Sequence, residues 1–207
     1  MSSKKQEIPD IIVARLPKYL RVLSLLREKG ETTNSKEIGE LLGYSAAQIR
    51  KDFSQFGEFG KQGTGYNIDF LMQQIRSILK IDKEWKILLA GCGNIGRAIL
   101  NYPGFPENGF NIVAAVDSSP EVIGKQITET ICVRDINDVK SIIRENDIRI
   151  AMLTVPASVA QSVAERLVEC GIKGILTYAP AILNLPDDVW VEYEDPVISL
   201  QHITYYI

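Results

Sequence analysis

The sequence has few residues of the kinds that build metal sites or disulfide frameworks. Its 207 residues include one histidine and three cysteines, Cys92, Cys132 and Cys170. The cysteines are odd in number, lie far apart and show no C-x-x-C pair or other metal-ligand spacing. We therefore predict no metal and no disulfide framework, and we interpret the three cysteines as buried reduced thiols.

Long apolar runs are absent as well. No stretch approaches the roughly 18 residues that a membrane span requires, and the polar start MSSKKQE lacks the apolar core of a secretion signal. With 45% hydrophobic and 24% charged residues, the composition is typical of globular proteins. We expect a cytoplasmic protein with no membrane partner.

The charges are unevenly distributed along the chain. Residues 1–83 carry 14 Lys and Arg against 10 Asp and Glu, a net charge of +4, whereas residues 84–207 carry 9 against 16, a net charge of −7. Such asymmetry is expected where one domain approaches phosphates and the other does not. The length also suits two small domains. We predict domains at 1–83 and 84–195 and a C-terminal segment at 196–207.

The first domain has the pattern of a winged helix-turn-helix. Apolar residues recur at helical spacing near its start, and Pro17 favours two helices over one because it lacks the N–H that a helix interior needs. Cap residues then introduce a helix over residues 35–42, which Gly43 ends, and Ser45 caps a third segment over residues 46–57. Helix, short turn and helix is helix-turn-helix spacing.

A glycine-rich stretch, EFGKQGTGYNI, follows the third segment. Its glycines permit turns with positive φ, so the stretch predicts a tight hairpin. A hairpin directly after a recognition helix forms a wing. Residues 68–81 are again amphipathic and predict a connecting helix, and the polar residues 82–84 mark the domain boundary.

Polar side chains on the third segment and in the wing are candidates for reading DNA. Arg can pair with guanine, Gln with adenine, and Lys with guanine or a phosphate. The candidate DNA-binding residues are Ser45, Gln48, Arg50, Lys51 and Lys61. The alternative is an ordinary solvated helix face. The adjoining hairpin argues against that alternative, because helix-turn-helix plus hairpin is a known DNA-reading geometry.

From Trp85 onward the pattern alternates between strands and helices. Helices are predicted at 97–102, 136–145 and 157–170, between the apolar strands KILLAG, NIVAAVD, RIAMLTV, GILTY and VWVEYED. Repeated βα units predict an α/β fold, a Rossmann-like doubly wound and mostly parallel sheet with helices on both faces. The final stretch, 198–207, fits either a short helix or a strand, and periodicity does not decide between them.

A motif of the form G-x-G-x-x-G follows the first of these strands and precedes a helix. Its residues are Gly91, Cys92, Gly93, Asn94, Ile95 and Gly96. The first glycine permits a tight turn, the second lets a pyrophosphate approach the backbone, and the third lets the helix pack closely on the strand. The helix N-terminus offers its unpaired N–H groups to the phosphates, without any side-chain cation. The alternative, a glycine turn in a domain that binds nothing, fits this context less well.

Asp117 ends the next strand, 21 residues beyond Gly96. Its carboxylate is placed to accept hydrogen bonds from both hydroxyls of an adenosine ribose. A 2′-phosphate would face a like charge there, and Ser118 and Ser119 supply no compensating cation. The motif and its acid therefore predict NAD(H) as the cofactor, in preference to NADP(H).

Two further strand ends lie on the same edge of the predicted sheet, where ligands bind in doubly wound folds. Thr154, Val155 and Pro156 follow one strand, and Tyr178 follows the next. We predict that these residues line the cofactor site. The alternatives are a proline that simply begins a helix and an ordinary core tyrosine.

The second domain lacks the acid or base that a dehydrogenase needs. The only histidine, His202, lies near the C-terminus and outside the strand-end loops. Too little chain follows Asp195 to form a substrate domain. We predict a protein that is not an enzyme. One alternative is a small NAD-dependent oxidoreductase, and another keeps the fold but changes the ligand to coenzyme A or another nucleotide.

Four ordered stretches carry a resemblance that spans nearly the whole chain. They are SAAQIRKDFSQFGEFGKQGTGYNI at 45–68, GCGNIGRAILNYPGF at 91–105, LTVPASVAQ at 153–161 and GIKGILTYAP at 171–180. Together they resemble the redox-sensing transcriptional repressor Rex family. The resemblance implies a homodimer whose winged helices bind palindromic operator DNA near respiratory and fermentative genes, and which leaves the DNA when NADH replaces NAD+.

The resemblance also implies roles for single residues. The glycine loop and Asp117 hold the nucleotide, and Tyr102 responds to the reduced nicotinamide. Arg15 and Asp195 resemble a switch pair that holds the two domains in one redox state's arrangement. The C-terminal segment is implied to be exchanged between subunits.

Three features depart from the family pattern. Ser119 stands in place of a second acid, Thr177 and Tyr178 replace a common Asn-Phe, and Pro196 follows Asp195 in place of a bulky apolar residue. These departures bear on redox tuning. Pro196 in particular is expected to stop a helix from propagating through that point.

Overall fold

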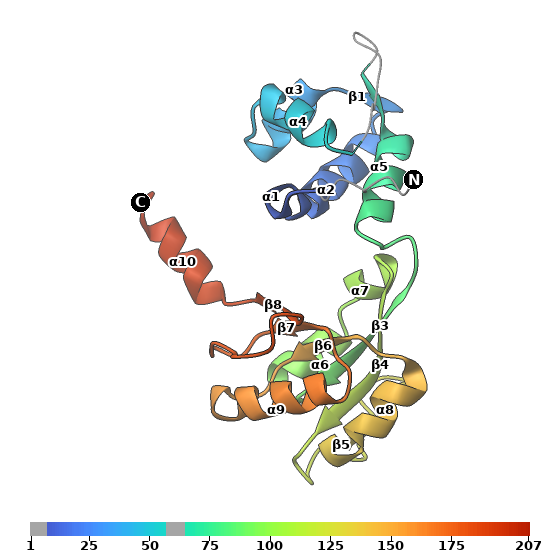
Figure 1. Ribbon diagram of the computed structural model, residues 1–207, viewed down its shortest axis with the longest axis vertical. Helices are drawn as coiled ribbons and strands as arrows, with labels where there is room; N and C mark the ends of the chain where they lie inside the picture. The colour runs from blue at the N-terminus through green and yellow to red at the C-terminus, as the bar shows by residue number, and fades with distance from the viewer. Residues whose placement is uncertain (1–7, 57–64) are drawn as a thin grey trace, which may run out of the picture. The chain divides into compact units, whose positions relative to one another are not determined.

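The structure, a computed structural model, describes residues 8–56 and 65–207. The chain divides into two compact units, Met1–Lys83 and Glu84–Ile207, which we call unit 1 and unit 2 (Figure 1).

Unit 1 begins with two helices, α1 (Asp10–Val13) and α2 (Leu16–Arg27). Pro17 lies in the first turn of α2, where its missing N–H costs no hydrogen bond. The predicted break at this proline is therefore present. Leu16, Tyr19 and Leu23 of α2 are fully buried and form the centre of the unit's core.

The helix-turn-helix follows as α3 (Ser35–Leu42) and α4 (Ala46–Phe53). The Asn34 side chain caps α3, Gly43 ends it with a left-handed φ of 71°, and the Ser45 hydroxyl caps α4. Helix α4 is shorter than the predicted 46–57. The helix ends at Phe53, whose ring packs edge-on against Tyr19 and Tyr66, and Ser54 is its C-cap. Phe56 still packs on this core from beyond the helix.

A small antiparallel sheet and a helix complete unit 1. Strand β1 (Thr32–Thr33) pairs with β2 (Tyr66–Asn67), and α5 (Ile68–Ile78) follows. Helix α5 ends three residues before the predicted Ile81, and its Ile68, Leu71 and Ile75 complete the core. The tip of the predicted wing, including Lys61, lies outside the described residues.

Unit 2 contains a six-stranded sheet in which all neighbouring strands are parallel. Its strands are β3 (Trp85–Ala90), β4 (Phe110–Asp117), β5 (Val133–Asp135), β6 (Ile150–Leu153), β7 (Gly174–Thr177) and β8 (Trp190–Tyr193). Their order is β5-β4-β3-β6-β7-β8. The chain moves outward from β3 in both directions, so the order reverses between β3 and β6, and ligands bind at such a reversal.

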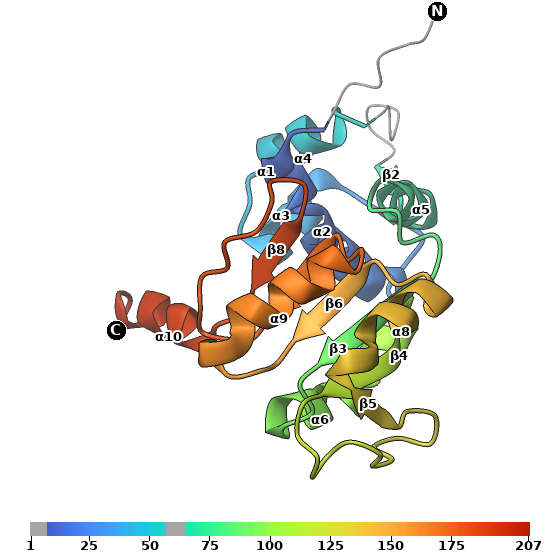
Figure 2. The same ribbon diagram turned by 60° about the horizontal axis from the view of Figure 1, so that its bottom comes forward.

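Helices cover both faces of this sheet, as predicted (Figure 2). On one face lie α8 (Val139–Asn146) and α9 (Ala157–Glu169), which pack on Leu88, Val116 and Leu153. On the other lie α6 (Asn94–Leu100) and α7 (Gly104–Glu107). The predicted helix over 136–145 begins instead with a short 3-10 turn, Ile136–Asp138, whose N-cap is Asp135.

The boundaries of α6 differ from the prediction of a helix over 97–102. The helix starts at Asn94, directly after Gly93, and ends at Leu100. Pro103 disfavours the helical conformation for the residue before it, which leaves Tyr102 outside the helix. The earlier start places the helix N-terminus inside the glycine motif.

The last helix, α10 (Pro196–Thr204), resolves the stretch that periodicity left undecided. Pro196 occupies its first position, and the Asp195 carboxylate accepts a hydrogen bond from the Val197 N–H at 2.8 Å. No helix therefore runs through this point, as expected, and the proline begins α10. No residue of α10 is buried, and its apolar side chains Val197, Ile198, Leu200 and Ile203 are more than half exposed. In the described ranges, no helix is long and apolar enough to cross a membrane.

Candidate functional site

A cavity of about 1030 Å³ lies at the carboxyl ends of β3, β4 and β6. Its volume is at the upper end of the roughly 300–1,000 Å³ that is usual for small-molecule sites. The glycine loop forms one wall, Asp117 and the turn after it form another, and the start of α9 forms a third. The cavity therefore lies where the strand order of the sheet reverses.

The three glycines of the motif do different work. Gly91 has a φ of +99°, and a Cβ there would lie 2.8 Å from the Thr154 carbonyl oxygen. A Cβ on Gly96 would lie 2.1 Å from the Gly91 carbonyl oxygen. Gly93 has ordinary backbone angles and open space where its Cβ would be. Folding thus requires Gly91 and Gly96, whereas Gly93 leaves room for a ligand beside the backbone.

Thr154 fastens the glycine loop to the neighbouring strand. Its hydroxyl donates to the Gly91 carbonyl oxygen at 2.6 Å, and its N–H donates to the Ala90 carbonyl oxygen at 2.8 Å. The side chain that was predicted to face a cofactor therefore also fixes the loop that forms the site.

Asp117 is held in place by the backbone on both sides. Its Oδ2 accepts a hydrogen bond from the Cys92 N–H at 2.7 Å, and its Oδ1 accepts one from the Ser119 N–H at 2.9 Å. Each carboxylate oxygen keeps a further lone pair. The carboxylate is thus fixed at the cavity wall with an acceptor left on each oxygen.

Cys92 lies within the motif, but its thiol is fully buried. Burial, followed by the nearby Asp117 carboxylate, raises the pKa of the Cys92 thiol to about 12. The residue packs as a small apolar group, as the sequence predicted, whereas Cys132 is exposed and Cys170 is half-buried.

Most of the predicted cofactor residues line the cavity. These are Gly91, Cys92, Gly93, Asn94, Ile95, Asp117, Thr154, Val155, Pro156 and Tyr178. Gly96 is not among the lining residues because it packs under the loop. Tyr102 does not line the cavity either. Its exposed ring lies against Gly104, where an added Cβ would be 2.4 Å from it, and meets Phe105 edge-on with centroids 5.2 Å apart.

Two cations that the sequence reasoning missed also line the cavity, Arg97 and Lys125. Arg97 lies in the last turn of α6, and its Nη2 donates to Asn94 Oδ1 at 3.0 Å. Lys125 follows the turn after β4 and is eight residues beyond Asp117. The prediction weighed only Ser118 and Ser119, which supply no cation for a 2′-phosphate, and did not consider Arg97 and Lys125.

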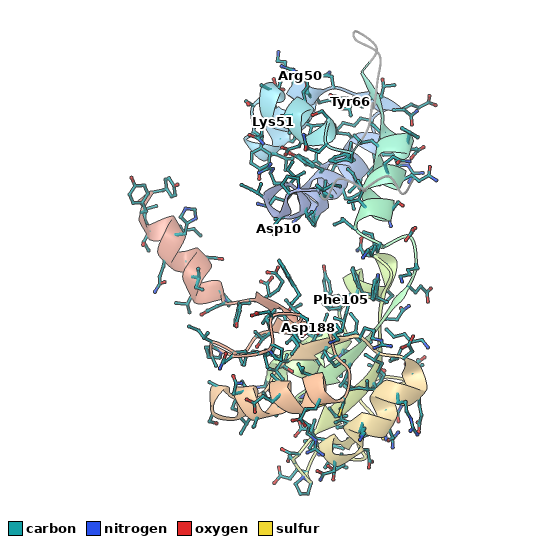
Figure 3. The ribbon with its side chains drawn as sticks, in the orientation of Figure 1. Asp10, Arg50, Lys51, Tyr66, Phe105 and Asp188 are labelled. Atoms are coloured by element: carbon teal, nitrogen blue, oxygen red, sulfur yellow. The ribbon has the colours of Figure 1, made fainter. Side chains whose placement is uncertain are left out.

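The candidate DNA-reading residues lie in two different settings on α4. Arg50 and Lys51 are exposed on the side of unit 1 formed by α3 and α4 (Figure 3). Arg50 Nη1 donates to Ser35 Oγ at 3.1 Å. Together with Ala47 and Ser54, which are also exposed, they form a stripe at helical spacing, and Ala47 and Ser54 were not predicted.

The other two candidates on α4 are already engaged. The Ser45 hydroxyl accepts a hydrogen bond from the Gln48 N–H at 3.1 Å and so caps the helix. The Gln48 side chain donates from Nε2 to Asp52 Oδ1 at 2.8 Å and is half-buried. Its amide is turned toward the core and away from the exposed stripe.

Arg15 also has a partner inside unit 1. Its Nε and Nη2 donate to the two carboxylate oxygens of Asp52 at 2.6 and 2.8 Å. Asp195, which the family resemblance pairs with Arg15, caps α10 in unit 2. The switch pair therefore stays a prediction.

The described residues contain no group of three His, Cys, Asp or Glu that could hold a metal ion. His202 lies on the exposed helix α10, and its ring meets Tyr206 edge-on. Neither His202 nor any cysteine other than Cys92 is among the residues that line the cavity.

Comparison with known proteins gives matches over both units. A family model described as "CoA binding domain" matches residues 82–181, and one described as "Putative DNA-binding protein N-terminus" matches residues 7–54. The redox-sensing transcriptional repressor Rex of Roseiflexus sp. is 47% identical over 99% of this chain and 93% of its own length. That of Chloroflexus aurantiacus is 49% identical over 96% and 94%.

The chain belongs to the Rex family of redox-sensing transcriptional repressors. Among solved structures, RSP in complex with beta-NAD+ and operator DNA matches with a TM-score of 0.90 and 37% identity, covering 97% of this chain and 93% of that one. RSP in complex with beta-NADH matches with a TM-score of 0.88, 35% identity and coverage of 97% and 94%. The predicted fold class, a DNA-binding N-terminal domain followed by a Rossmann-like domain, is confirmed.

Proposed function

We propose that this chain is a redox-sensing transcriptional repressor in which unit 1 binds operator DNA and unit 2 binds NAD(H). One observation carries the proposal. The chain matches, over 97% of its length and with a TM-score of 0.90, a Rex-family repressor solved with NAD+ and operator DNA. The repressor names of its relatives also argue against the oxidoreductase alternative.

The proposed cofactor site uses the residues of the cavity in unit 2. The pyrophosphate would lie over Gly91–Gly96, beside the open space at Gly93, and receive the N–H groups at the start of α6. Asp117 would accept hydrogen bonds from the adenosine ribose with its free lone pairs. Thr154, Val155, Pro156 and Tyr178 would line the rest of the site, with Tyr102 near the nicotinamide end.

The difference between the two redox states is a charge. The nicotinamide of NAD+ carries a positive charge that NADH lacks, so an apolar lining such as Val155, Pro156 and Pro180 favours the reduced form. The ratio of the two affinities then sets how far the conformational equilibrium moves.

The proposed DNA interface is the exposed face of α4, assisted by the wing. Arg50 and Lys51 would contact bases and phosphates, with Ser45 at the helix start and Lys61 in the wing. A homodimer presents two such helices to the half-sites of a palindrome, about 34–36 Å apart, so a few ångströms of displacement releases one of them. Binding of NADH and of operator DNA then oppose each other by the same factor.

The proposed dimer also gives the C-terminal segment a purpose. Residues 196–207 form a helix and tail whose apolar side chains are exposed in the single chain. Exchange of this segment between subunits would bury them, and would bring Asp195 to the partner's Arg15 in one redox state. This arrangement rests on the family resemblance and on the exposed apolar side chains.

Calorimetric titration tests the ligand assignment. We expect NADH to bind more tightly than NAD+, and NADPH and coenzyme A to bind more weakly than either. Tight binding of coenzyme A without a response to NADH would favour the other ligand class, which the name of the matching family model suggests. A turnover assay with alcohols and NAD+ tests the oxidoreductase alternative, and no steady-state reduction is expected.

A further inference from the structure

Asp52 is the most densely hydrogen-bonded side chain of unit 1. Its carboxylate accepts two hydrogen bonds from Arg15, one from the Tyr19 hydroxyl and one from the Gln48 amide. The side chain of Asp52 is only 1% exposed and that of Arg15 only 16%. Because this carboxylate is buried and accepts four hydrogen bonds, it is a structural part of the core and differs from a surface ion pair.

The hydrogen-bond donors around Asp52 favour the ionised form of its carboxylate. Burial by itself raises the pKa of Asp52, but the hydrogen bonds from Arg15, Tyr19 and Gln48 together outweigh burial and hold that pKa below its usual value. The same contacts raise the pKa of Arg15. Asp52 is therefore ionised at neutral pH and depends on Arg15 for compensation.

The network joins three places in the chain. Arg15 is the residue that precedes α2, Tyr19 lies in the first turns of α2, and Gln48 lies in the first turn of α4. The sequence separations of 37 and 33 residues show that Asp52 ties α4 to α2 directly. Asp52 thus adds a polar connection between α4 and α2 to the apolar packing of Ile49 and Phe53.

Gln48 stands at the edge of the surface that α4 presents. The exposed stripe of α4 consists of Ala47, Arg50, Lys51 and Ser54. Gln48 lies beside this stripe and is half-buried. A glutamine reads adenine by pointing both its amide nitrogen and its oxygen at the base. The Gln48 nitrogen instead donates to Asp52 at 2.8 Å.

We propose that Asp52 is a positioning residue that withholds Gln48 from the bases, and that Arg15 maintains this arrangement by neutralising Asp52. This inference rests on the proposed function, because it concerns how α4 reads an operator. In the repressor as it stands, Arg50 and Lys51 contact the DNA, and Gln48 is a structural ligand of the carboxylate. Loss of the Arg15 guanidinium leaves a buried charge undercompensated and loosens α4.

The test measures the binding of fluorescently labelled duplexes to the full chain by anisotropy, without nucleotide and at fixed salt. The duplexes are the operator, a set with each base pair changed in turn, and a scrambled sequence. The proteins are the wild type, Gln48→Ala, Arg15→Met, Arg15→Lys and Asp52→Asn, with Arg50→Met as the matched control on the exposed stripe.

For Gln48→Ala we expect operator affinity within about threefold of the wild type and an unchanged order of preference among the altered duplexes, whereas Arg50→Met should lose roughly tenfold. Arg15→Met and Asp52→Asn should lose roughly tenfold for the operator but under threefold for scrambled DNA, because Arg50 and Lys51 still meet phosphates. Arg15→Lys, which keeps the charge, should recover part of the loss. A purely structural role would lower both affinities equally.

Two results would overturn the inference. One is that Gln48→Ala abolishes discrimination at an A·T pair, which would make Gln48 a direct reader. The other is that Arg15→Met and Asp52→Asn retain full preference for the operator. Gln48→Ala removes only one of the four hydrogen bonds to Asp52. Its discrimination among the altered duplexes therefore tests the inference even if the Arg15 variants fold poorly. Failure of the wild type to prefer its operator would instead count against the proposed function.

Discussion

The Cys92 N–H donates a hydrogen bond to Asp117 Oδ2 at 2.7 Å and so ties the glycine loop to the end of β4. The two parts of the dinucleotide motif, 25 residues apart in sequence, are thus joined directly by a hydrogen bond. The carboxylate is positioned for a ribose by the same backbone that forms the loop.

Replacement of Asp117 is therefore expected to weaken nucleotide binding and leave DNA binding intact. A hydrogen bond to a charged group is worth about 1.5–3 kcal/mol, so Asp117→Ala should weaken NADH binding by roughly 10- to 100-fold. Calorimetry with NADH and anisotropy with operator DNA measure the two effects. Asp188→Asn is the control, because that exposed carboxylate pairs with Lys173 away from the cavity. Unchanged NADH affinity in Asp117→Ala would contradict the role given to Asp117.

Alanine at Gly93 and alanine at Gly96 should fail in different ways. A Cβ at Gly93 meets nothing within 4 Å, so Gly93→Ala should fold as the wild type does but obstruct the pyrophosphate. A Cβ at Gly96 would lie 2.1 Å from the Gly91 carbonyl oxygen, so Gly96→Ala should destabilise unit 2. Overpacking of this kind costs about 1–3 kcal/mol. Urea unfolding followed by the fluorescence of Trp85 and Trp190, with NADH titration alongside, separates the two. Equal stability of both variants would contradict this division.

The thiol of Cys92 should resist alkylation in the folded protein. Because the pKa of this thiol is about 12, only about one Cys92 side chain in ten thousand is a thiolate at pH 8. Cys132 is exposed and should react first with iodoacetamide, which peptide mass spectrometry measures. In Cys132→Ser, Cys92 of the folded chain should be labelled slowly, and urea should restore labelling at Cys92. Fast labelling of Cys92 without denaturant would show that the loop is open.

Unit 1 should lose stability in acid through Asp52. Its pKa lies below the usual value because Arg15, Tyr19 and Gln48 donate to it against the opposing effect of burial. The unfolded state therefore binds a proton more readily than the folded state. The contribution of Asp52 begins to fall near the unfolded pKa of about 3.9 and is lost as pH drops through the lower folded pKa. Amide hydrogen exchange in α2 and α4 measures this loss, and Asp52→Asn should show a weaker pH dependence. The same acid slope in both proteins would rule out Asp52 as its source.

Local patterns sufficed to predict much of the fold and the cofactor site. The spacing of glycines after an apolar strand predicted the loop, and its distance to Asp117 predicted the acid, because both follow from the repeat of a βα unit. Asn34, Gly43 and Ser45 likewise delimit α3 and α4 through hydrogen bonds to near neighbours. The helix caps depend on residues a few positions apart, and the acid depends on the regular length of a βα unit.

Several of the failures involve contacts between residues far apart in sequence. Nothing beside Arg15 indicates that it meets Asp52, because the two residues lie 37 positions apart. Gln48 lies only four residues before Asp52 on α4, and the prediction missed this i, i+4 pair. Lys125 reaches the cavity through an irregular turn that has no periodicity. Periodicity could not identify helix α10 because its apolar residues do not gather on one face. No residue of this helix is buried in the single chain.

We propose that the oxidation state of a dinucleotide at Gly91–Gly96 controls the affinity of α4 for operator DNA. Gel shifts of a palindromic operator across an NADH series, at fixed salt and with NAD+ present, test it most directly. We predict that NADH releases the DNA at concentrations where it binds unit 2, and that Asp117→Ala shifts this release to higher NADH. Operator binding that stays constant while NADH saturates the protein would contradict the account.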